Sequence, residues 1–286
     1  MALLSEDPPP RGIAQTILPG IRRIVARNPG PMSYHGTNTW LVDDGADGVL
    51  VVDPGPADHT HLQDILRHSE APIRAILITH YHADHSGNAG ALRHATGAPI
   101  VAFDRFALPQ LAIDIAMAHG DRFAGIRALH TPGHASDHLC FQLEDGTLFS
   151  GDVVMGWAST VVSPPDGSMT AYLASLEMLL AMGGGVYLPG HGPAILNPEA
   201  HVLELLNRRR QREDEILALL GAAPATPEDI RLQLYHKVEP RLVRAASRNV
   251  MAHLEKLAME GRVICIDGAV WCSTSAAPSA RPRRGE

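Results

Sequence analysis

Four side chains that commonly bind metal ions lie within six consecutive positions of the sequence, at His80, His82, Asp84 and His85. They follow a run of β-branched and apolar residues at 73–78, which is typical of a buried strand. An uncompensated cluster of imidazoles and a carboxylate costs several kcal/mol to hold away from water, whereas a divalent cation turns the same groups into a binding site. The sequence therefore predicts a metal ion at the end of this strand.

Three later segments share one arrangement, in which a predicted strand leads to a glycine and then a potential metal ligand. They are TPGH at 131–134, SGD at 150–152 and PGHG at 189–192. The ligands that they offer are His134, Asp152 and His191, respectively. Because loops of this kind can meet at one edge of a sheet, we expect these side chains to join the first cluster. Imidazole and carboxylate ligands suit Zn²⁺ best, with Mn²⁺ or Fe as alternatives.

The segments THYHADH, TPGH, FSGD and PGHG, in this order and spacing, resemble the motifs of the metallo-β-lactamase superfamily over residues 20–195. The resemblance implies an α/β fold, an αββα sandwich, that holds two divalent metal ions side by side. It assigns the seven ligands to a first ion (His80, His82 and His134), a second ion (Asp84, His85 and His191) and a bridge between the two (Asp152).

Two neighbouring cations lower the pKa of a shared water toward neutrality, so a metal-bridging hydroxide becomes available as a nucleophile. Such a site fits hydrolysis of an ester-type bond, either a phosphodiester such as RNA or a small acyl or phosphate ester. Asp84 is the candidate catalytic residue, because its carboxylate can orient the hydroxide or relay its proton while binding metal. Asp53 resembles the family's acid that steadies the ligand loop from behind. The turn at 36–39 resembles a family turn near the metal mouth.

Strand-like runs in two groups, with helical segments between and after them, indicate a layered arrangement with helices outside. We expect a catalytic domain at 1–198, a linker helix at 199–221, a winged-helix domain at 222–273 and a flexible tail at 274–286. The linker helix is expected to break at Gly221 and Pro224. A capped helix start at Thr226-Pro227-Glu228 and a hairpin around Asp267-Gly268 indicate the winged helix.

The C-terminal pattern over about 210–272 resembles a winged-helix-bearing, β-lactamase-like branch that includes a mitochondrial endoribonuclease. This resemblance implies single-stranded RNA or a small ester as the substrate. A glyoxalase-II-like thioesterase is an alternative, but such enzymes grip glutathione with basic C-terminal residues, and the only lysines here are Lys237 and Lys256. A second alternative is a winged-helix DNA-binding regulator with a non-catalytic metal domain. The intact ligands at all seven positions disfavour it.

Some further residues have two interpretations. His130 and His138 flank the TPGH segment and are candidates for positions behind the ligands. Trp157 follows the predicted bridging residue closely, so it is a candidate for either a substrate wall or the core. The arginines within 208–212 suggest contact with phosphate, but the acidic residues at 213–215 favour a solvated helix face.

The charge distribution bears on the class of partner. The net charge is −7, and residues 1–198 hold 10 Lys+Arg against 19 Asp+Glu, whereas residues 199–286 hold 14 against 12. An acidic catalytic part repels polyanions at long range, which counts against nucleic acid without excluding it. No apolar run reaches the ~20 residues of a membrane helix, and the first residues lack the pattern of a secretory signal. We expect a cytoplasmic enzyme with reduced cysteines, no membrane contact and no stable protein partner.

Overall fold

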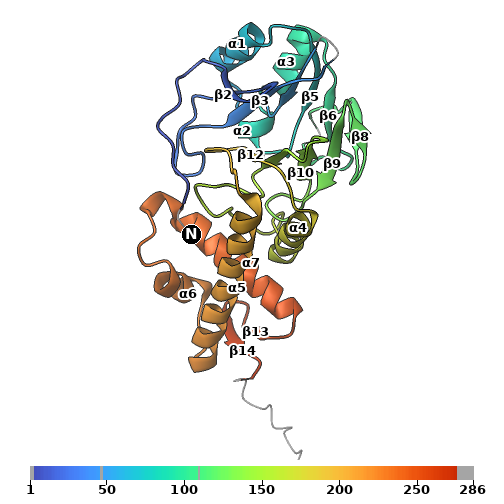
Figure 1. Cartoon of the computed structure of the whole chain (residues 1–286). Helices are drawn as coiled ribbons and strands as arrows, with labels where there is room; N and C mark the ends of the chain where they lie inside the picture. The colour runs from blue at the N-terminus through green and yellow to red at the C-terminus, as the bar shows by residue number, and fades with distance from the viewer. Residues whose placement is uncertain (1–2, 46–47, 109, 276–286) are drawn as a thin grey trace, which may run out of the picture.

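The computed structural model describes residues 3–45, 48–108 and 110–275, and most of the tail expected at 274–286 lies outside these ranges. Its larger part contains two stacked β-sheets (Figure 1). The first sheet has its seven strands in chain order: β1 (Gln15–Leu18), β2 (Ile21–Val25), β3 (Asn38–Asp43), β4 (Val49–Val52), β5 (Ile73–Leu77), β6 (Ile100–Phe103) and β7 (Ile115–Met117). Neighbours from β1 to β4 are antiparallel, and those from β4 to β7 are parallel.

The second sheet has five strands in the order β12-β11-β10-β9-β8. Their bounds are β8 (Arg122–Phe123), β9 (Ile126–His130), β10 (Leu139–Gln142), β11 (Leu148–Gly151) and β12 (Tyr187–Pro189). The strands β8 to β11 pair antiparallel, whereas β12 runs parallel to β11. As a result β11 and β12 end at the same edge, and the loops that follow them lie next to each other.

Three apolar layers hold the sheets and helices together. Large side chains such as Trp40 and Phe149 fill the space between the two sheets. Helices α1 (His59–His68) and α3 (Ala89–Thr96) cover the outer face of the first sheet. Helix α4 (Met169–Met182) covers the outer face of the second. The order helix, sheet, sheet, helix confirms the predicted α/β, αββα sandwich.

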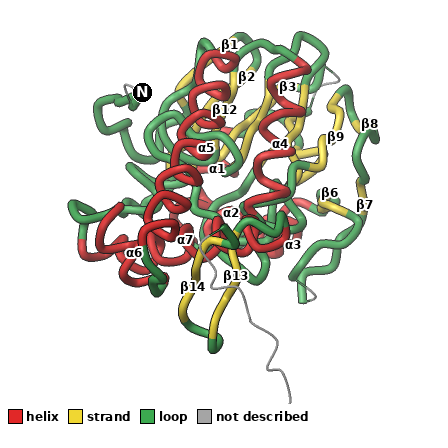
Figure 2. The backbone as a smooth tube through the Cα atoms, turned by 90° about the horizontal axis from the view of Figure 1, so that it is seen from below, coloured by secondary structure: helices red, strands yellow, loops and turns green. Residues whose placement is uncertain are grey.

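The C-terminal part contains α5 (Pro198–Ala222), α6 (Pro227–Leu234), a 3-10 turn η1 (Pro240–Leu242), α7 (Val243–Met259) and the hairpin strands β13 (Val263–Ile266) and β14 (Val270–Ser273). The helices and the hairpin pack around a separate apolar core (Figure 2). Helix α6 begins with the predicted cap, because the Thr226 hydroxyl accepts a hydrogen bond from the Asp229 amide and the Asp229 carboxylate accepts one from the Thr226 amide. This arrangement confirms the predicted winged helix.

Helix α5 joins the two parts of the molecule. Its first half packs Leu205 and Leu206 against α4, and its second half packs Ile216 and Leu220 in the C-terminal core. Helix α5 ends at Ala222, one residue after Gly221 and before Pro224, close to the two residues at which a break was expected. Among the described residues, none of the helices is both long and apolar enough to cross a lipid bilayer.

Three short strands, β1, β7 and β8, and the helix α3 were not predicted from the sequence. Each has at most eight residues, which is too few for a hydrophobic period to stand out. The edge strand β8 has only two residues and pairs with β9 through a short turn. These elements exist because neighbouring strands and helices already supply the surface against which they pack.

The expected solvated arginine face on α5 is wrong for Arg209. Its side chain is buried, donates a hydrogen bond to the Thr160 carbonyl and lies 5.2 Å from the centre of the Tyr172 ring. The neighbouring Arg210 is exposed and pairs with Glu177. The helical turn rotates consecutive side chains by about 100°, so one of the two arginines faces the second sheet's helical layer and the other faces solvent.

We expect Arg209→Ala to lower the free energy of unfolding by about 2–4 kcal/mol, because it leaves a void and an unsatisfied buried carbonyl. The matched Arg210→Ala variant loses one exposed ion pair and should change the free energy of unfolding by less than about 1 kcal/mol. Urea unfolding followed by circular dichroism measures both. Equal unfolding midpoints for the two variants would contradict a structural role for Arg209.

Candidate metal centre

The predicted ligands lie in loops that follow strands at one edge of the two sheets. The loop after β5 carries His80 and His82 and continues into a single helical turn, α2 (Ala83–Ser86), which carries Asp84 and His85. The second sheet supplies the other three: His134 follows β9, Asp152 directly follows β11, and His191 follows β12. Segments more than a hundred residues apart in the chain thus meet at one place, because β5 of the first sheet and β9, β11 and β12 of the second sheet end at a common edge.

The seven side chains form overlapping groups with the spacing that metal ligands need. In the first group, Nδ1 of His82 lies 2.8 Å from Nε2 of His80 and 3.0 Å from Nε2 of His134. In a second group, Oδ2 of Asp84 lies 3.4 Å from Nε2 of His191 and 3.7 Å from Nε2 of His85. Each group brings one ligand atom from each of three residues within 4.8 Å of the others.

The carboxylate of Asp152 lies between these two groups. Its Oδ1 is 3.5 Å from Nε2 of His85, and its Oδ2 is 3.7 Å from Nε2 of His134 and 3.5 Å from Nε2 of His191. A third ligand group, His80, His85 and Asp152, takes one histidine from each of the other two. Asp152 is therefore the residue whose two oxygens face both groups, as expected for the bridging position.

Electrostatics differ between the two groups. Burial lowers the pKa of His80 well below its ordinary value, and the neighbouring histidines add to this effect. Burial also lowers the pKa of His82 to about 4, together with the nearby His134 and His85. Both rings are therefore neutral near pH 7, and a neutral imidazole has the lone pair that a metal ion requires.

In the second group the carboxylates dominate. Burial acts to lower the pKa of His191, but Asp152 and Asp84 outweigh it and raise the pKa to about 9. The pKa of His85 is raised well above its ordinary value, since Asp152, Asp84 and Asp53 outweigh its burial. In turn, burial acts to raise the pKa of Asp152, but His191 and His85 hold it well below its usual range. The three carboxylates thus favour the protonated, positively charged forms of His85 and His191.

Unsatisfied atoms in the centre fit a bound cation. Among the described residues, Nε2 of His85 and Oδ1 of Asp152 are buried without a hydrogen-bond partner. Such atoms cost free energy in a dry interior unless another group satisfies them. Both belong to a ligand group and both face the middle of the cluster. The donor set of imidazole nitrogens and carboxylate oxygens therefore fits divalent metal ions of the Zn²⁺, Mn²⁺ or Fe type.

Asp53 holds the ligand loop in place from behind. It directly follows β4, and one carboxylate oxygen accepts hydrogen bonds from the Thr79 amide and the other from the Thr79 hydroxyl, each at 2.8 Å. The second oxygen also lies 2.8 Å from Nδ1 of His85, which leaves Nε2 of that ring to face the cluster. The side chain is 1% exposed, so water does not compete for these bonds. This geometry is what the expected supporting role of Asp53 requires.

Three other contacts orient the ligands, and sequence reasoning identified them only in part. His138 is buried, and its Nε2 accepts a hydrogen bond from the Asp152 amide at 3.1 Å. His130 instead stacks on Phe103 and takes no part in the cluster. The amide nitrogen of Asn38 donates to the carbonyls of Pro189 and Gly192, which fixes the loop that carries the last histidine. Asn38 opens β3 and lies in the segment 36–39. The resemblance of this segment to a family turn was the indication in the sequence that it lies near the ligands.

Close packing in the centre explains one of the glycines in the PGHG segment. A Cβ atom on Gly190 would lie 2.5 Å from a ring carbon of His85 and 2.6 Å from Oδ1 of Asp152. Those distances are far below van der Waals contact, and the neighbours are themselves ligands. A larger residue at this position would displace the ligands, so only glycine lets the loop approach them.

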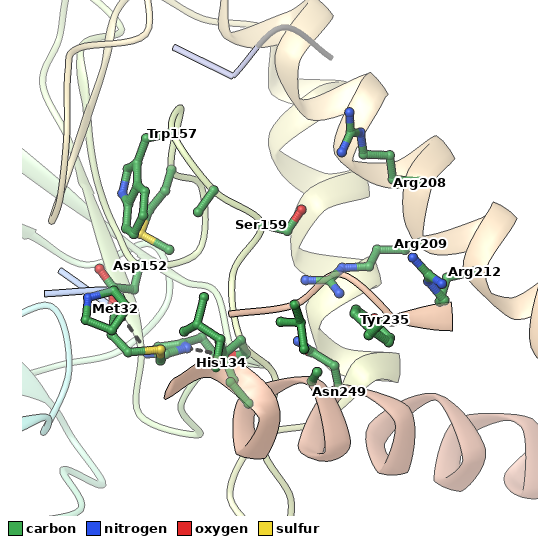
Figure 3. Close-up of a pocket in the computed structure, with 18 of the residues that line it drawn as sticks. Met32, His134, Asp152, Trp157, Ser159, Arg208, Arg209, Arg212, Tyr235 and Asn249 are labelled. Atoms are coloured by element: carbon green, nitrogen blue, oxygen red, sulfur yellow. Dashed lines mark hydrogen bonds and ion pairs between the residues drawn. The ribbon is translucent and has the colours of Figure 1, made fainter. Parts of the chain in front are cut away.

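A cavity of about 700 Å³ opens beside the cluster (Figure 3). His134 and Asp152 line one side of it, next to Trp157, and Arg208, Arg209, Arg212 and Tyr235 lie on the other side. Trp157 therefore lines the cavity wall, one of the two positions expected for it. The two sides come from the catalytic part and from the C-terminal helices, so the cavity lies between the two parts of the molecule.

Family comparisons agree with this geometry. The family model described as the metallo-beta-lactamase superfamily matches residues 33–191. The model described as the beta-lactamase associated winged helix domain matches residues 226–271. The first region contains the strands from β3 to β12 and the loops with the predicted ligands, and the second contains α6, α7 and most of the C-terminal hairpin.

Similar proteins include a Beta-lactamase-like protein 2 homolog from Drosophila melanogaster, which is 33% identical over 84% of this chain and 88% of its own length. An atrochrysone carboxyl ACP thioesterase from Aspergillus chevalieri is 35% identical over 74% of this chain and 69% of its own length. Both matches extend well beyond the histidine motifs.

Solved structures share the fold. A beta-lactamase domain protein from Burkholderia ambifaria matches with a TM-score of 0.80 and 21% identity, over 93% of this chain and 95% of that one. A di-iron-bound form of TTHA1623 matches with a TM-score of 0.53 and 27% identity, over 61% of this chain and 93% of that one. From its sequence motifs, its fold and its relatives, the chain belongs to the metallo-beta-lactamase superfamily of hydrolases, and it carries the associated winged helix domain at its C-terminal end.

Proposed function

We propose that this protein is a dinuclear metal-dependent hydrolase of carboxylic esters or thioesters. The observation that carries the proposal is the convergence of seven ligand side chains, with Asp152 placed between two three-residue groups. His80, His82 and His134 would hold one ion, and Asp84, His85 and His191 would hold the other. Zn²⁺ is the expected metal, and the di-iron form of a similar protein keeps iron as an alternative.

Two divalent ions held at these residues supply Lewis acidity and lower the pKa of a shared water. The protein's own groups then set orientation and proton movement. Asp84 is only half-buried, and its Oδ2 lies 3.4 Å from Nε2 of His191, so its carboxylate can orient or relay a proton at the cluster. Asp53 and Thr79 keep the His85 ring fixed, which preserves the spacing of the ligands.

The cavity beside the cluster favours an acyl substrate over a nucleic acid. Part of its wall is apolar, with Met155, Trp157 and Leu242 among the lining residues. Two of its arginines pair with acidic neighbours, Arg208 with Glu204 and Arg212 with Glu215, so little positive charge is left for a phosphate backbone. A similar protein named as an ACP thioesterase supports thioester chemistry. Single-stranded RNA, expected from the winged-helix branch, is the substrate against which this proposal is tested.

Removing the bridging carboxylate tests the mechanism. We expect Asp152→Ala to lower kcat/KM at least about 100-fold on every substrate, because loss of Lewis-acid stabilisation costs several kcal/mol. Elemental analysis should show less bound metal, and circular dichroism should show a folded protein. Glu144→Ala serves as the control, because it changes an exposed carboxylate in the turn between β10 and β11, at the opposite end of β11 from Asp152. Full turnover by an Asp152→Ala protein that has lost its metal would rule out the proposed centre.

The supporting residue should act on metal affinity. We expect Asp53→Asn to weaken metal binding by about 10–100-fold, because the amide cannot accept both Thr79 hydrogen bonds and the His85 proton. Excess metal should restore most of the activity, which distinguishes this role from direct catalysis. Titration of the metal-depleted variant with Zn²⁺ measures the effect. An unchanged affinity would show that Asp53 does not position the ligands.

Metal binding should release protons. His191 has a pKa of about 9 in the metal-free centre, so its ring carries a proton at neutral pH that a metal ion must displace. Apparent metal affinity should therefore rise with pH up to about 9 and fall as the pH drops. Calorimetric titrations at pH ~7 in buffers of different ionisation enthalpy count the released protons. Binding with no proton release would contradict this charge assignment.

A further inference from the structure

A second cavity also reaches the ligand cluster and adjoins the larger cavity at His134. It has a volume of about 540 Å³, and its lining includes His82 as well as His134. It shares His134, Met32, Val161 and Ala245 with the larger cavity of about 700 Å³. A molecule that lies across the cluster can therefore place one part of itself in each cavity, with the bond between the two parts next to the proposed metal ligands.

The two cavities differ in charge. In the larger one, Arg208 and Arg212 each pair with a glutamate, and Arg209 is committed to the Thr160 carbonyl. These three arginines are therefore neutralised or structurally engaged. What remains for contact with a substrate in this cavity is largely apolar, including Trp157 and Val238.

The second cavity has an excess of positive charge. Arg241, Arg244 and Arg248 line it, and their spacing of three and four residues places them on one face of η1 and α7. Asp166 is the acidic residue in this lining, and it is already engaged by the Ser136 amide and the Tyr81 hydroxyl. Three guanidinium groups and one hydrogen-bonded carboxylate thus line this cavity, and one of the three, that of Arg241, also pairs with Glu239.

The arginines of this face differ in how they are held. Arg248 donates to the Pro164 carbonyl at 3.1 Å, and Arg241 pairs with Glu239 through exposed side chains. Arg244 is exposed and has no hydrogen bond or ion pair with any of the residues that the structure describes. The guanidinium of Arg244 lines a cavity that also includes two of the candidate ligands, His82 and His134, so it is available to bind an anion next to the cluster.

We propose that the substrate is an ester or thioester with two unlike arms, and that Arg241, Arg244 and Arg248 bind its anionic arm while the larger cavity binds its apolar arm. This inference rests on the proposed function, because it places the bond to be cleaved at the same metal cluster. Guanidinium groups recognise carboxylate and phosphate alike, so the anion is one of these two. The arginines act as specificity residues and take no part in the chemical step.

The test uses thioesters that share one apolar acyl group and differ only in the thiol arm. The arms are N-acetylcysteamine, which is neutral, glutathione, which carries carboxylates, and coenzyme A, which carries phosphates. We expect wild-type kcat/KM to be about tenfold or more higher for one of the anionic arms than for the neutral arm. In Arg244→Gln this ratio should fall about tenfold. Arg210→Gln, an arginine of α5 outside both cavities, should leave the ratio as in the wild type.

Binding without turnover gives an independent measurement. S-Methyl glutathione and S-methyl coenzyme A cannot be hydrolysed, and calorimetry on metal-depleted protein reports their Kd directly. We expect the preferred anionic ligand to bind about tenfold more weakly to Arg244→Gln, and the difference to shrink at high salt. Which of the two ligands shows this behaviour identifies the anion as carboxylate or phosphate.

The outcomes separate this inference from the proposed function. If the neutral thioester is hydrolysed but Arg244→Gln changes neither the arm ratio nor the Kd, the bipartite substrate is wrong and the hydrolase proposal stands. If single-stranded RNA is cleaved and none of the thioesters is, both proposals are wrong. If anion binding depends on Arg244 and the anionic thioester is the best substrate, both are supported.

Discussion

Buried charge compensation at one sheet edge is the interaction on which the rest of this structure depends. The buried Asp53 and Asp152 and the half-buried Asp84 surround the buried rings of His85 and His191. Each group alone would be destabilising there, since burial disfavours the charged form of every one of them. Opposite charges and lone pairs that face a common centre offset this cost, and the same arrangement fits a divalent metal ion.

The strand pairing in the two sheets brings these charged side chains together. Parallel pairing of β4 with β5 and of β11 with β12 brings the ends of four strands to the edge where the ligands lie. The Asp53 carboxylate links two of these ends by accepting hydrogen bonds from Thr79. Glycine at position 190 lets the last loop approach the others without a clash. The apolar layers around the sheets supply the rigidity that keeps such short distances constant.

The C-terminal helices form part of the surroundings of the ligand cluster. Helix α5 belongs to both apolar cores, and Arg209 ties it to the segment after β11. Asn249 of α7 accepts a hydrogen bond from the Val162 amide, which fixes α7 close to the ligand loops. This docking creates two adjoining cavities that share His134, and residues of the C-terminal helices line both of them.

The sequence by itself determined the types of candidate ligand in the centre, because imidazole and carboxylate side chains at fixed spacing after strand-like runs are local features. It also indicated the layered fold, the capped start at Thr226 and the C-terminal hairpin, each of which has a local signal. Tertiary structure decided the rest. Two features depend on contacts between segments distant in the chain: Arg209 is buried while Arg210 is exposed, and Arg244 lines a cavity together with His134. No local pattern encodes such contacts, since they arise only when helices and sheets dock and exclude water between them.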